Sequence, residues 1–264
     1  MEVAKKMRFG ICTGLENLEL LERLGYDYIE PQASVVAKYT EEEMKMWKEK
    51  LAQSSVSCET FNVLLPGNFR CIGEEYKEEE LKEYLHTAFS NVQALGGQVV
   101  VFGSGTQRSC PDTVEFTEGV RQLVAVYRLV GEIASQYGLT IVVEPLNRKE
   151  NNMICTMTEG AMIQAMVNLP NVQLLTDYYH VATDADPISD IVRIGHFTHV
   201  HIATKEGRRY PLKREGDKFE EFFDALHQIG YQGRVSIEGG TDNMEEDAKI
   251  ALKLLKELDA EKKG

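Results

Sequence analysis

The stretch Thr140-Ile-Val-Val-Glu144 is a run of β-branched residues that stops at a carboxylate, and three later stretches follow the same plan. Such runs favour strands, so each stretch predicts a short buried strand that ends at a group able to bind a metal. The other three are Val172-Gln-Leu-Leu-Thr-Asp177, Thr198-His-Val-His201 and Arg234-Val-Ser-Ile-Glu238. Three carboxylates and one imidazole that converge on one point would form a site for a hard divalent metal.

Strand and helix signals alternate eight times around these stretches. The predicted strands lie at residues 8–12, 26–30, 57–65, 98–102, 139–144, 172–177, 197–202 and 234–238. The predicted helices lie at residues 16–24, 41–53, 77–95, 114–137, 158–169, 187–194, 219–229 and 245–258. This alternation predicts an α/β fold, a (β/α)8 TIM barrel, as a single domain over residues 1–264. A doubly wound open sheet is the alternative.

Composition and charge narrow the class of protein. A net charge of −13 argues against a protein that binds nucleic acid, because phosphates require a basic surface. The chain has five cysteines without C-x-x-C spacing, which argues against a disulfide framework or a zinc knuckle and favours a reducing compartment. The first seven residues lack the apolar segment of a signal peptide, and no stretch reaches the roughly 20 apolar residues that span a bilayer. We therefore expect a cytoplasmic protein that does not bind membranes.

The four strand-end groups are the candidate metal ligands. In a TIM barrel, catalytic groups lie at the C-terminal ends of the strands, and Glu144, Asp177, His201 and Glu238 end four neighbouring predicted strands. One imidazole and three carboxylates suit Mn²⁺, Co²⁺ or Mg²⁺. The alternative is that these carboxylates cap helices or pair with arginines, but burying several like charges without a cation is costly.

Several segments resemble a known family. They are Val143-Glu-Pro-Leu-Asn-Arg148, Thr176-Asp-Tyr-Tyr-His180, His199-Val-His201 and Ser236-Ile-Glu238, together with the loop Phe102-Gly-Ser-Gly-Thr-Gln-Arg108. They are similar to the xylose-isomerase-like sugar isomerases and epimerases, and most similar to the ketose 3-epimerase branch. The resemblance implies one divalent metal, Mn²⁺ before Co²⁺ or Mg²⁺, and a dimer or tetramer. It also implies residue roles: Glu144, Asp177, His201 and Glu238 as metal ligands, Glu144 and Glu238 as the acid/base pair, and His180, Arg208 and Glu150 as residues that orient the sugar.

Other polar residues carry more than one interpretation. Arg208 and Arg209 follow the seventh predicted strand, and either could clamp a substrate oxygen or belong to a solvated loop. The spacing from His201 is one residue longer than in the epimerase pattern, which leaves the choice of arginine open. Arg108 could reach a substrate from the loop after the fourth strand. His199 is more typical of a hydrogen-bonded core histidine than of a ligand, and Glu30 could hold an arginine or histidine behind the site.

The chemistry of these groups predicts an isomerase or epimerase. Moving a stereocentre or carbonyl along a sugar requires removal of a proton next to a carbonyl, and the enediolate that forms carries negative charge on two oxygens. A metal that chelates both oxygens would stabilise it, and two carboxylates on opposite faces would exchange the protons.

Other functions could use the same scaffold. One is a lyase that acts on a keto-sugar, on a cyclitol as inosose dehydratases do, or on an oxidised C-glycoside with the help of a second subunit. A non-catalytic sugar-binding protein is another. A barrel endonuclease is disfavoured by the charge and by the small number of histidines.

Overall fold

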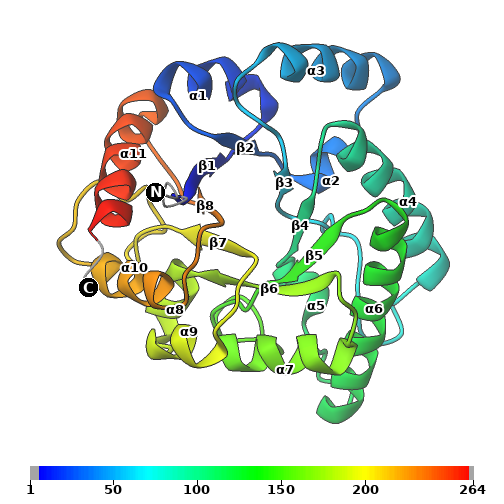
Figure 1. Cartoon of the computed structure of the whole chain (residues 1–264). Helices are drawn as coiled ribbons and strands as arrows, with labels where there is room; N and C mark the ends of the chain where they lie inside the picture. The colour runs from blue at the N-terminus through cyan, green and yellow to red at the C-terminus, as the bar shows by residue number, and fades with distance from the viewer. Residues whose placement is uncertain (1–5, 262–264) are drawn as a thin grey trace.

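A computed structural model describes residues 6–261, so the expectation about a signal peptide lies partly outside the described residues. Eight parallel strands form one sheet with the order β2-β1-β8-β7-β6-β5-β4-β3. Bridges between Tyr28 and Ser57 and between Gln32 and Asn62 join the two outer strands, so the sheet forms a nearly closed barrel (Figure 1). The strands are β1 Arg8–Cys12, β2 Tyr28–Glu30, β3 Thr60–Phe61, β4 Val99–Phe102, β5 Thr140–Val143, β6 Val172–Asp177, β7 His199–Ile202 and β8 Arg234–Ile237. The predicted TIM barrel is confirmed.

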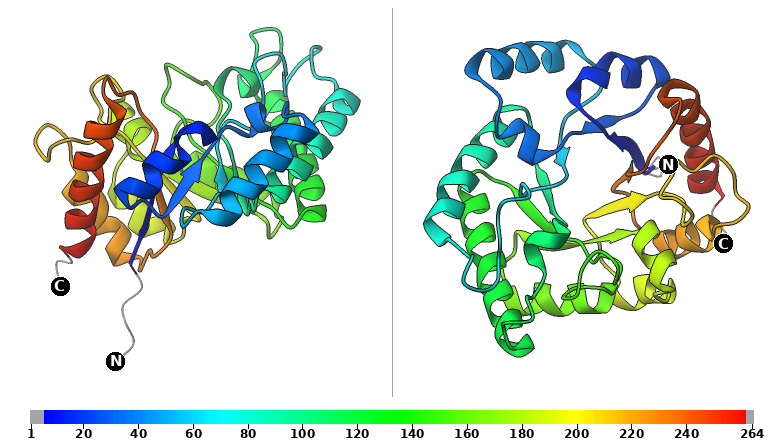
Figure 2. Two further views of the ribbon diagram at one scale, coloured as in Figure 1. Left: turned by 90° about the horizontal axis from the view of Figure 1, so that it is seen from above. Right: turned by 180° about the vertical axis from the view of Figure 1, so that it is seen from behind.

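Helices surround the ring of strands, as the view from behind in Figure 2 shows. Each strand is followed by at least one helix before the next strand begins. The helical segments are η1 Leu15–Asn17, α1 Leu18–Leu24, α2 Ala33–Val36, α3 Glu41–Gln53, α4 Glu78–Ala94, α5 Gly105–Arg108, α6 Phe116–Gln136, α7 Met157–Val167, α8 Tyr178–Asp184, α9 Ser189–Ile194, α10 Phe219–Gln228 and α11 Met244–Ala260. Within the described residues, none of these helices combines the length and apolarity needed to cross a bilayer.

The structure differs from the sequence-based prediction in the third strand and in three short helices. The strand expected over residues 57–65 is reduced to Thr60–Phe61, because the backbone turns at Val63, where φ is +46°. Leu64 and Leu65 are nevertheless fully buried, so an apolar loop gave the same pattern as a strand. The helices α2, α5 and α8 were not predicted. They contain four, four and seven residues, which is too short for a clear helical periodicity.

Side-chain alternation along the strands places the candidate ligands inside the ring. Val99, Val101, Val142 and Leu175 form an apolar cluster separate from the large core that packs against the helices. Side chains of a strand alternate between its two faces, so Glu144 lies on the same face as Val142, and Asp177 on the same face as Leu175. The apolar cluster therefore lies one layer below the strand-end carboxylates.

Candidate metal and catalytic site

The four predicted metal ligands lie together at the C-terminal mouth of the barrel. Glu144, Asp177, His201 and Glu238 each offer one ligand atom, and these atoms all lie within 4.8 Å of one another. Nδ1 of His201 is 3.4 Å from Oε1 of Glu144 and 3.2 Å from Oε2 of Glu238. We call these four residues the upper cluster.

The donor atoms of the upper cluster fit a divalent cation. Within the described residues, Oε1 of Glu144 and Nδ1 of His201 are buried without a hydrogen-bond partner. Buried polar atoms normally have partners, so unpaired atoms that face one another indicate a missing ligand. Oxygen and imidazole donors suit Mn²⁺, Co²⁺ or Mg²⁺, and the site contains three carboxylates that such a cation would neutralise.

The charges of the upper cluster are not balanced by the protein alone. Burial, with the nearby Glu238 carboxylate, raises the pKa of Glu144. Burial also raises the pKa of Asp177 to about 7, against the opposing effect of Arg208. Burial acts in the same direction on Glu238, but His201 and Arg208 outweigh it and hold the pKa of Glu238 well below its usual range. The positive groups nearby, Arg208 and His201, therefore do not balance all three buried carboxylates.

Beneath the upper cluster lies a second group of acid and imidazole side chains, in which every carboxylate oxygen has a partner. Glu30 is fully buried and faces Nε2 of His199 at 2.8 Å and Nε2 of His201 at 2.9 Å. Ser236 also donates to Glu30, and the hydroxyls of Ser236 and Tyr28 are 2.7 Å apart. We call Glu30, His199, Ser236 and Tyr28 the lower cluster. It orients His201 from behind, so that Nδ1 faces the upper cluster.

His180 presents a neutral donor to the site. Its Nδ1 accepts a hydrogen bond from the backbone N–H of Asn147 at 3.0 Å, which leaves the proton on Nε2. Nε2 has no hydrogen-bond partner among the described residues and lies 3.5 Å from Oδ2 of Asp177. Burial, together with the charge of Arg208, lowers the pKa of His180 to about 3. A neutral imidazole with a free N–H can donate to a sugar oxygen.

The structure separates the two arginines between which the sequence left a choice. Arg208 lies against the site, with one guanidinium nitrogen 2.6 Å from Oε2 of Glu238 and 3.5 Å from Oδ2 of Asp177. Its other terminal nitrogen is 3.5 Å from Glu150, which places that predicted substrate contact at the rim. Arg209 instead pairs with Asp242.

Arg108 lies behind the site rather than at its surface. Its side chain is fully buried and donates to the backbone carbonyls of Gly103 and Glu144 at 2.7 and 2.9 Å, and to the hydroxyl of Tyr127 at 2.8 Å. These contacts occupy both terminal nitrogens of the guanidinium, so Arg108 supports the backbone at Glu144. The sequence placed it near a substrate because the loop itself borders the site.

Two residues of the site carried no clear signal in the sequence. Gly103 packs against the carboxylate of Glu144 so closely that a methyl group at position 103 would overlap Oε2. In the sequence this glycine is indistinguishable from one in an ordinary turn. Asn62 donates from Nδ2 to Oε1 of Glu238 at 2.8 Å. It lies inside an apolar stretch that predicts a strand, and its partner is 176 residues away in the chain.

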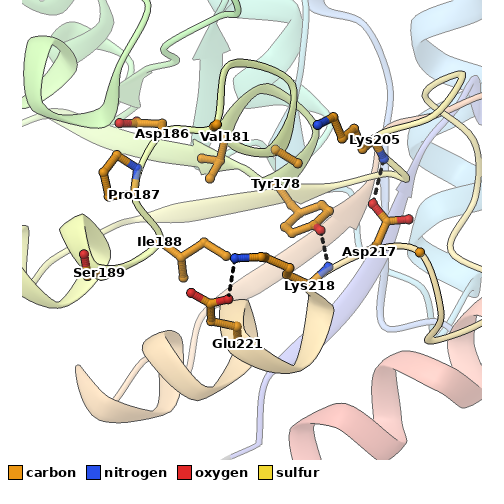
Figure 3. A pocket seen from close by; sticks show the side chains of 13 residues that line it. Tyr178, Val181, Asp186, Pro187, Ile188, Ser189, Lys205, Asp217, Lys218 and Glu221 are labelled. Carbon is orange, nitrogen blue, oxygen red and sulfur yellow. Dashed lines mark hydrogen bonds and ion pairs between the residues drawn. The ribbon is translucent and has the colours of Figure 1, made fainter.

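Two hollows lie near these residues. One, of about 480 Å³, is the mouth of the site and is bordered by Val63, Gly103, Lys149 and Arg208 along with Glu144 and Glu238. The other, of about 370 Å³, lies around Tyr178, the residue after Asp177 (Figure 3). Lys218 pairs with Glu221 there, and Asp217 accepts a hydrogen bond from the backbone N–H of Lys205. The Tyr178 hydroxyl accepts a hydrogen bond from the backbone N–H of Lys218, so this region anchors the loop that carries Arg208.

Comparison with known proteins decides the family. The model of the family described as xylose isomerase-like TIM barrel matches residues 18–258. The chain belongs to this family. The resemblance of its motifs to the xylose-isomerase-like enzymes is thereby confirmed.

Named members of this fold group include sugar epimerases. The chain is 26% identical to the 3-dehydro-D-guloside 4-epimerase of Escherichia coli K12 over 85% of this chain and 86% of the relative. It is 23% identical to the D-psicose 3-epimerase of Agrobacterium fabrum over 89% and 90% of the two chains. A crystal structure of D-psicose 3-epimerase in the presence of D-fructose superposes with a TM-score of 0.83 at 21% identity, over 96% of this chain and 99% of that one.

Proposed function

We propose that this protein is a divalent-metal-dependent sugar epimerase that inverts a carbon next to a ketone. The observation that carries the proposal is the upper cluster. Two glutamates face one imidazole there, and Oε1 of Glu144 and Nδ1 of His201 are buried without hydrogen-bond partners in the described part of the chain. The relatives support the same chemistry by their names. One is an epimerase of a ketose and the other epimerises a 3-dehydro sugar at the adjacent carbon 4.

Glu144, Asp177, His201 and Glu238 would hold the cation. When bound, it would act as a Lewis acid. It would lower the pKa of the C–H group next to the ketone and stabilise the negative charge that develops on the sugar oxygens. Mn²⁺ is our first choice, with Co²⁺ and Mg²⁺ as alternatives, because these ions accept mixed carboxylate and imidazole ligands.

Glu144 and Glu238 would move the protons. Each has one oxygen directed at His201, and its second oxygen lies elsewhere: Oε2 of Glu144 beside Gly103, and Oε1 of Glu238 beside Asn62. One carboxylate would take the proton from one face of the sugar, and the other would return a proton to the opposite face. His180 would donate from Nε2 to a sugar oxygen, while Arg208 and Glu150 would contact hydroxyls at the rim.

The proposal is tested by activity of metal-free protein before and after addition of Mn²⁺, Co²⁺ or Mg²⁺. The substrates are ketoses, keto-cyclitols, sugar phosphates and 3-dehydro-glycosides in deuterated water. We expect deuterium at one carbon and an epimer of otherwise unchanged mass. Release of water or an aglycone would indicate the lyase, and binding without exchange the sugar-binding protein. Full turnover without metal would contradict the proposal.

The assembly state is a separate proposal. We propose a dimer or tetramer in solution, as the resemblance implies. Light scattering would test this, and a monomer at micromolar concentration would contradict it.

A further inference from the structure

Asn62 stands where the barrel closes. It follows β3 and forms the bridge with Gln32 that joins the two outer strands of the sheet. Its backbone N–H donates to Pro31 at 3.1 Å, and its carbonyl accepts from Ala33 at 2.8 Å. The side chain is 4% exposed. Two backbone hydrogen bonds to the segment that follows β2 therefore hold Asn62 in place.

The side chain of Asn62 distinguishes the two oxygens of Glu238. Nδ2 donates to Oε1 at 2.8 Å, whereas Oε2 faces Nδ1 of His201 at 3.2 Å and Arg208 at 2.6 Å. The direction of the bond follows from chemistry, because an ionised carboxylate only accepts hydrogen bonds and the amide group must supply the N–H. Oε2 is thus directed at the cation site, and Oε1 is held away from it.

Two structural costs accompany this contact. Oδ1 of Asn62 is buried without a partner among residues 6–261, which is unfavourable for an amide oxygen. The next residue, Val63, has φ at +46°, a conformation that β-branched residues rarely adopt. Hydrogen bonds from the N–H of Ser34 to Val63 and from Leu64 to Val101 hold the turn in place. Strained or unsatisfied groups that persist next to a catalytic carboxylate indicate a functional constraint.

We infer that Asn62 is a positioning residue for Glu238: it holds the carboxylate so that one oxygen binds the cation and the other faces the substrate. The inference rests on the proposed function. Without Asn62, the carboxylate could rotate, and both metal binding and proton transfer at this face of the sugar would suffer. Neighbours that orient metal ligands typically contribute 10- to 100-fold in metal affinity, roughly the range we expect here.

The first test is the affinity of metal-free protein for Mn²⁺ by calorimetry, which requires no substrate. We expect Asn62→Ala and Asn62→Leu to weaken binding by about tenfold or more. Leu keeps the size of the side chain without its donor, so the pair separates loss of the hydrogen bond from loss of side-chain volume. The matched control is Asn171→Ala. Asn171 also donates from Nδ2, to the carbonyls of Gly131 and Leu139, and lies before β6 at the opposite end of the barrel. It should lower thermal stability without changing Mn²⁺ affinity.

The second test follows proton transfer with the epimers D-fructose and D-psicose in deuterated water. Glu238→Gln identifies which epimer is deprotonated by Glu144, because only that one still exchanges. Starting from that epimer, we compare two products: the starting sugar that has taken up deuterium, and the epimer. Asn62→Ala should raise the ratio of the first to the second by about tenfold, because one hydrogen bond to a charged group is lost. A generally damaged site would slow both processes equally.

Both tests can overturn the inference. If the Asn62 variants lose stability as Asn171→Ala does but keep Mn²⁺ affinity and the exchange ratio, Asn62 is only structural. If wild-type protein exchanges no proton with these sugars, the choice of substrate in the proposed function is at fault, and the Mn²⁺ measurement still decides the role of Asn62.

Discussion

The upper and lower clusters place acids and imidazoles in the same barrel and yet differ in how their charges are satisfied. In the lower cluster, Glu30 has two histidines and a serine as hydrogen-bond partners, and the two histidines hold its pKa well below the usual range despite complete burial. In the upper cluster, Glu144 and His201 keep unpaired buried atoms. The carboxylate of the lower cluster is fully paired within the protein, and the unpaired atom there, within the described residues, is Nδ1 of His199, whereas in the upper cluster the unpaired atoms of Glu144 and His201 face one another.

His201, a member of the upper cluster, also contacts the lower one. Its Nε2 faces Glu30 and its Nδ1 faces Glu144 and Glu238. The carboxylate below holds the ring in place, with Nε2 against Glu30 and Nδ1 directed at the two glutamates above. Under the proposed function, the hydrogen bonds of the lower cluster would orient His201, and the atoms of the upper cluster would coordinate the cation.

The largest expected effect comes from removing either glutamate that we assign to proton transfer. Glu144→Gln and Glu238→Gln should each lower kcat by roughly 10²- to 10⁴-fold, because an amide cannot act as a general base. Glu132→Gln, on the exposed side of α6, is the control and should leave kcat unchanged. Steady-state kinetics on the epimer pair measures the effect. A variant at position 144 or 238 with more than a tenth of the wild-type rate would remove that residue from the mechanism.

The second prediction contrasts the clusters directly through stability. Glu30→Gln should destabilise the protein by about 3 kcal/mol, because an amide placed between two histidines leaves buried donors unpaired. Asp177→Asn should instead stabilise the metal-free protein by about 1 kcal/mol, since it removes one of three competing buried charges. Chemical unfolding of both variants with and without Mn²⁺ measures these changes.

Addition of Mn²⁺ should reverse the order of wild type and Asp177→Asn. Wild type gains stability from binding, while the variant has lost a ligand and gains less. If Asp177→Asn were less stable than wild type even without metal, the view of the upper cluster as an unbalanced set of charges would be wrong.

The third prediction concerns the space that Gly103 leaves for Glu144. A side chain at this position would displace the carboxylate, and a shift of about 1 Å in a catalytic group can cost about 10²-fold in rate. We therefore expect Gly103→Ala to lower kcat/KM by 10- to 100-fold. Gly67→Ala is the control, because nothing lies within 4 Å of a methyl group there. Equal activity of the two variants would show that Glu144 does not require this space.

The sequence predicted the barrel and the upper cluster because both depend on a local pattern. β-Branched runs that end in Glu144, Asp177, His201 and Glu238 are visible within a few residues, and strand alternation sends all four side chains inward. The supporting residues were missed because they depend on distant partners. Asn62 contacts a residue 176 positions away. The need for glycine at position 103 becomes visible only from the Glu144 carboxylate that packs against it. Glu30 was expected to hold an arginine or a histidine, and it faces two histidines, 169 and 171 positions away.

The last prediction concerns the opposite end of the barrel, where Glu59 is balanced by arginines rather than by imidazoles. Nε of Arg234 donates to Oε2 of Glu59 at 2.7 Å, Ser57 donates to Oε1 at 2.8 Å, and Arg8 also pairs with the carboxylate. Burial opposes ionisation, but these contacts outweigh it and lower the pKa of Glu59 below its usual value. Glu59→Gln should therefore cost about 2 kcal/mol at neutral pH, the scale of hydrogen bonds to a charged group.

The pH dependence of that cost separates Glu59 from both clusters. A carboxylate whose pKa is lower in the folded state stabilises the protein fully above its unfolded pKa, about 4.3, and loses this contribution as the pH falls through the folded pKa. The difference in unfolding free energy between wild type and Glu59→Gln should thus be constant from pH 8 to about 5 and shrink below about pH 4. It should also be the same with and without Mn²⁺, because Glu59 lies at the N-terminal ends of the strands. A difference that grows on acidification, or that depends on Mn²⁺, would mean that the two ends of the barrel are electrostatically coupled.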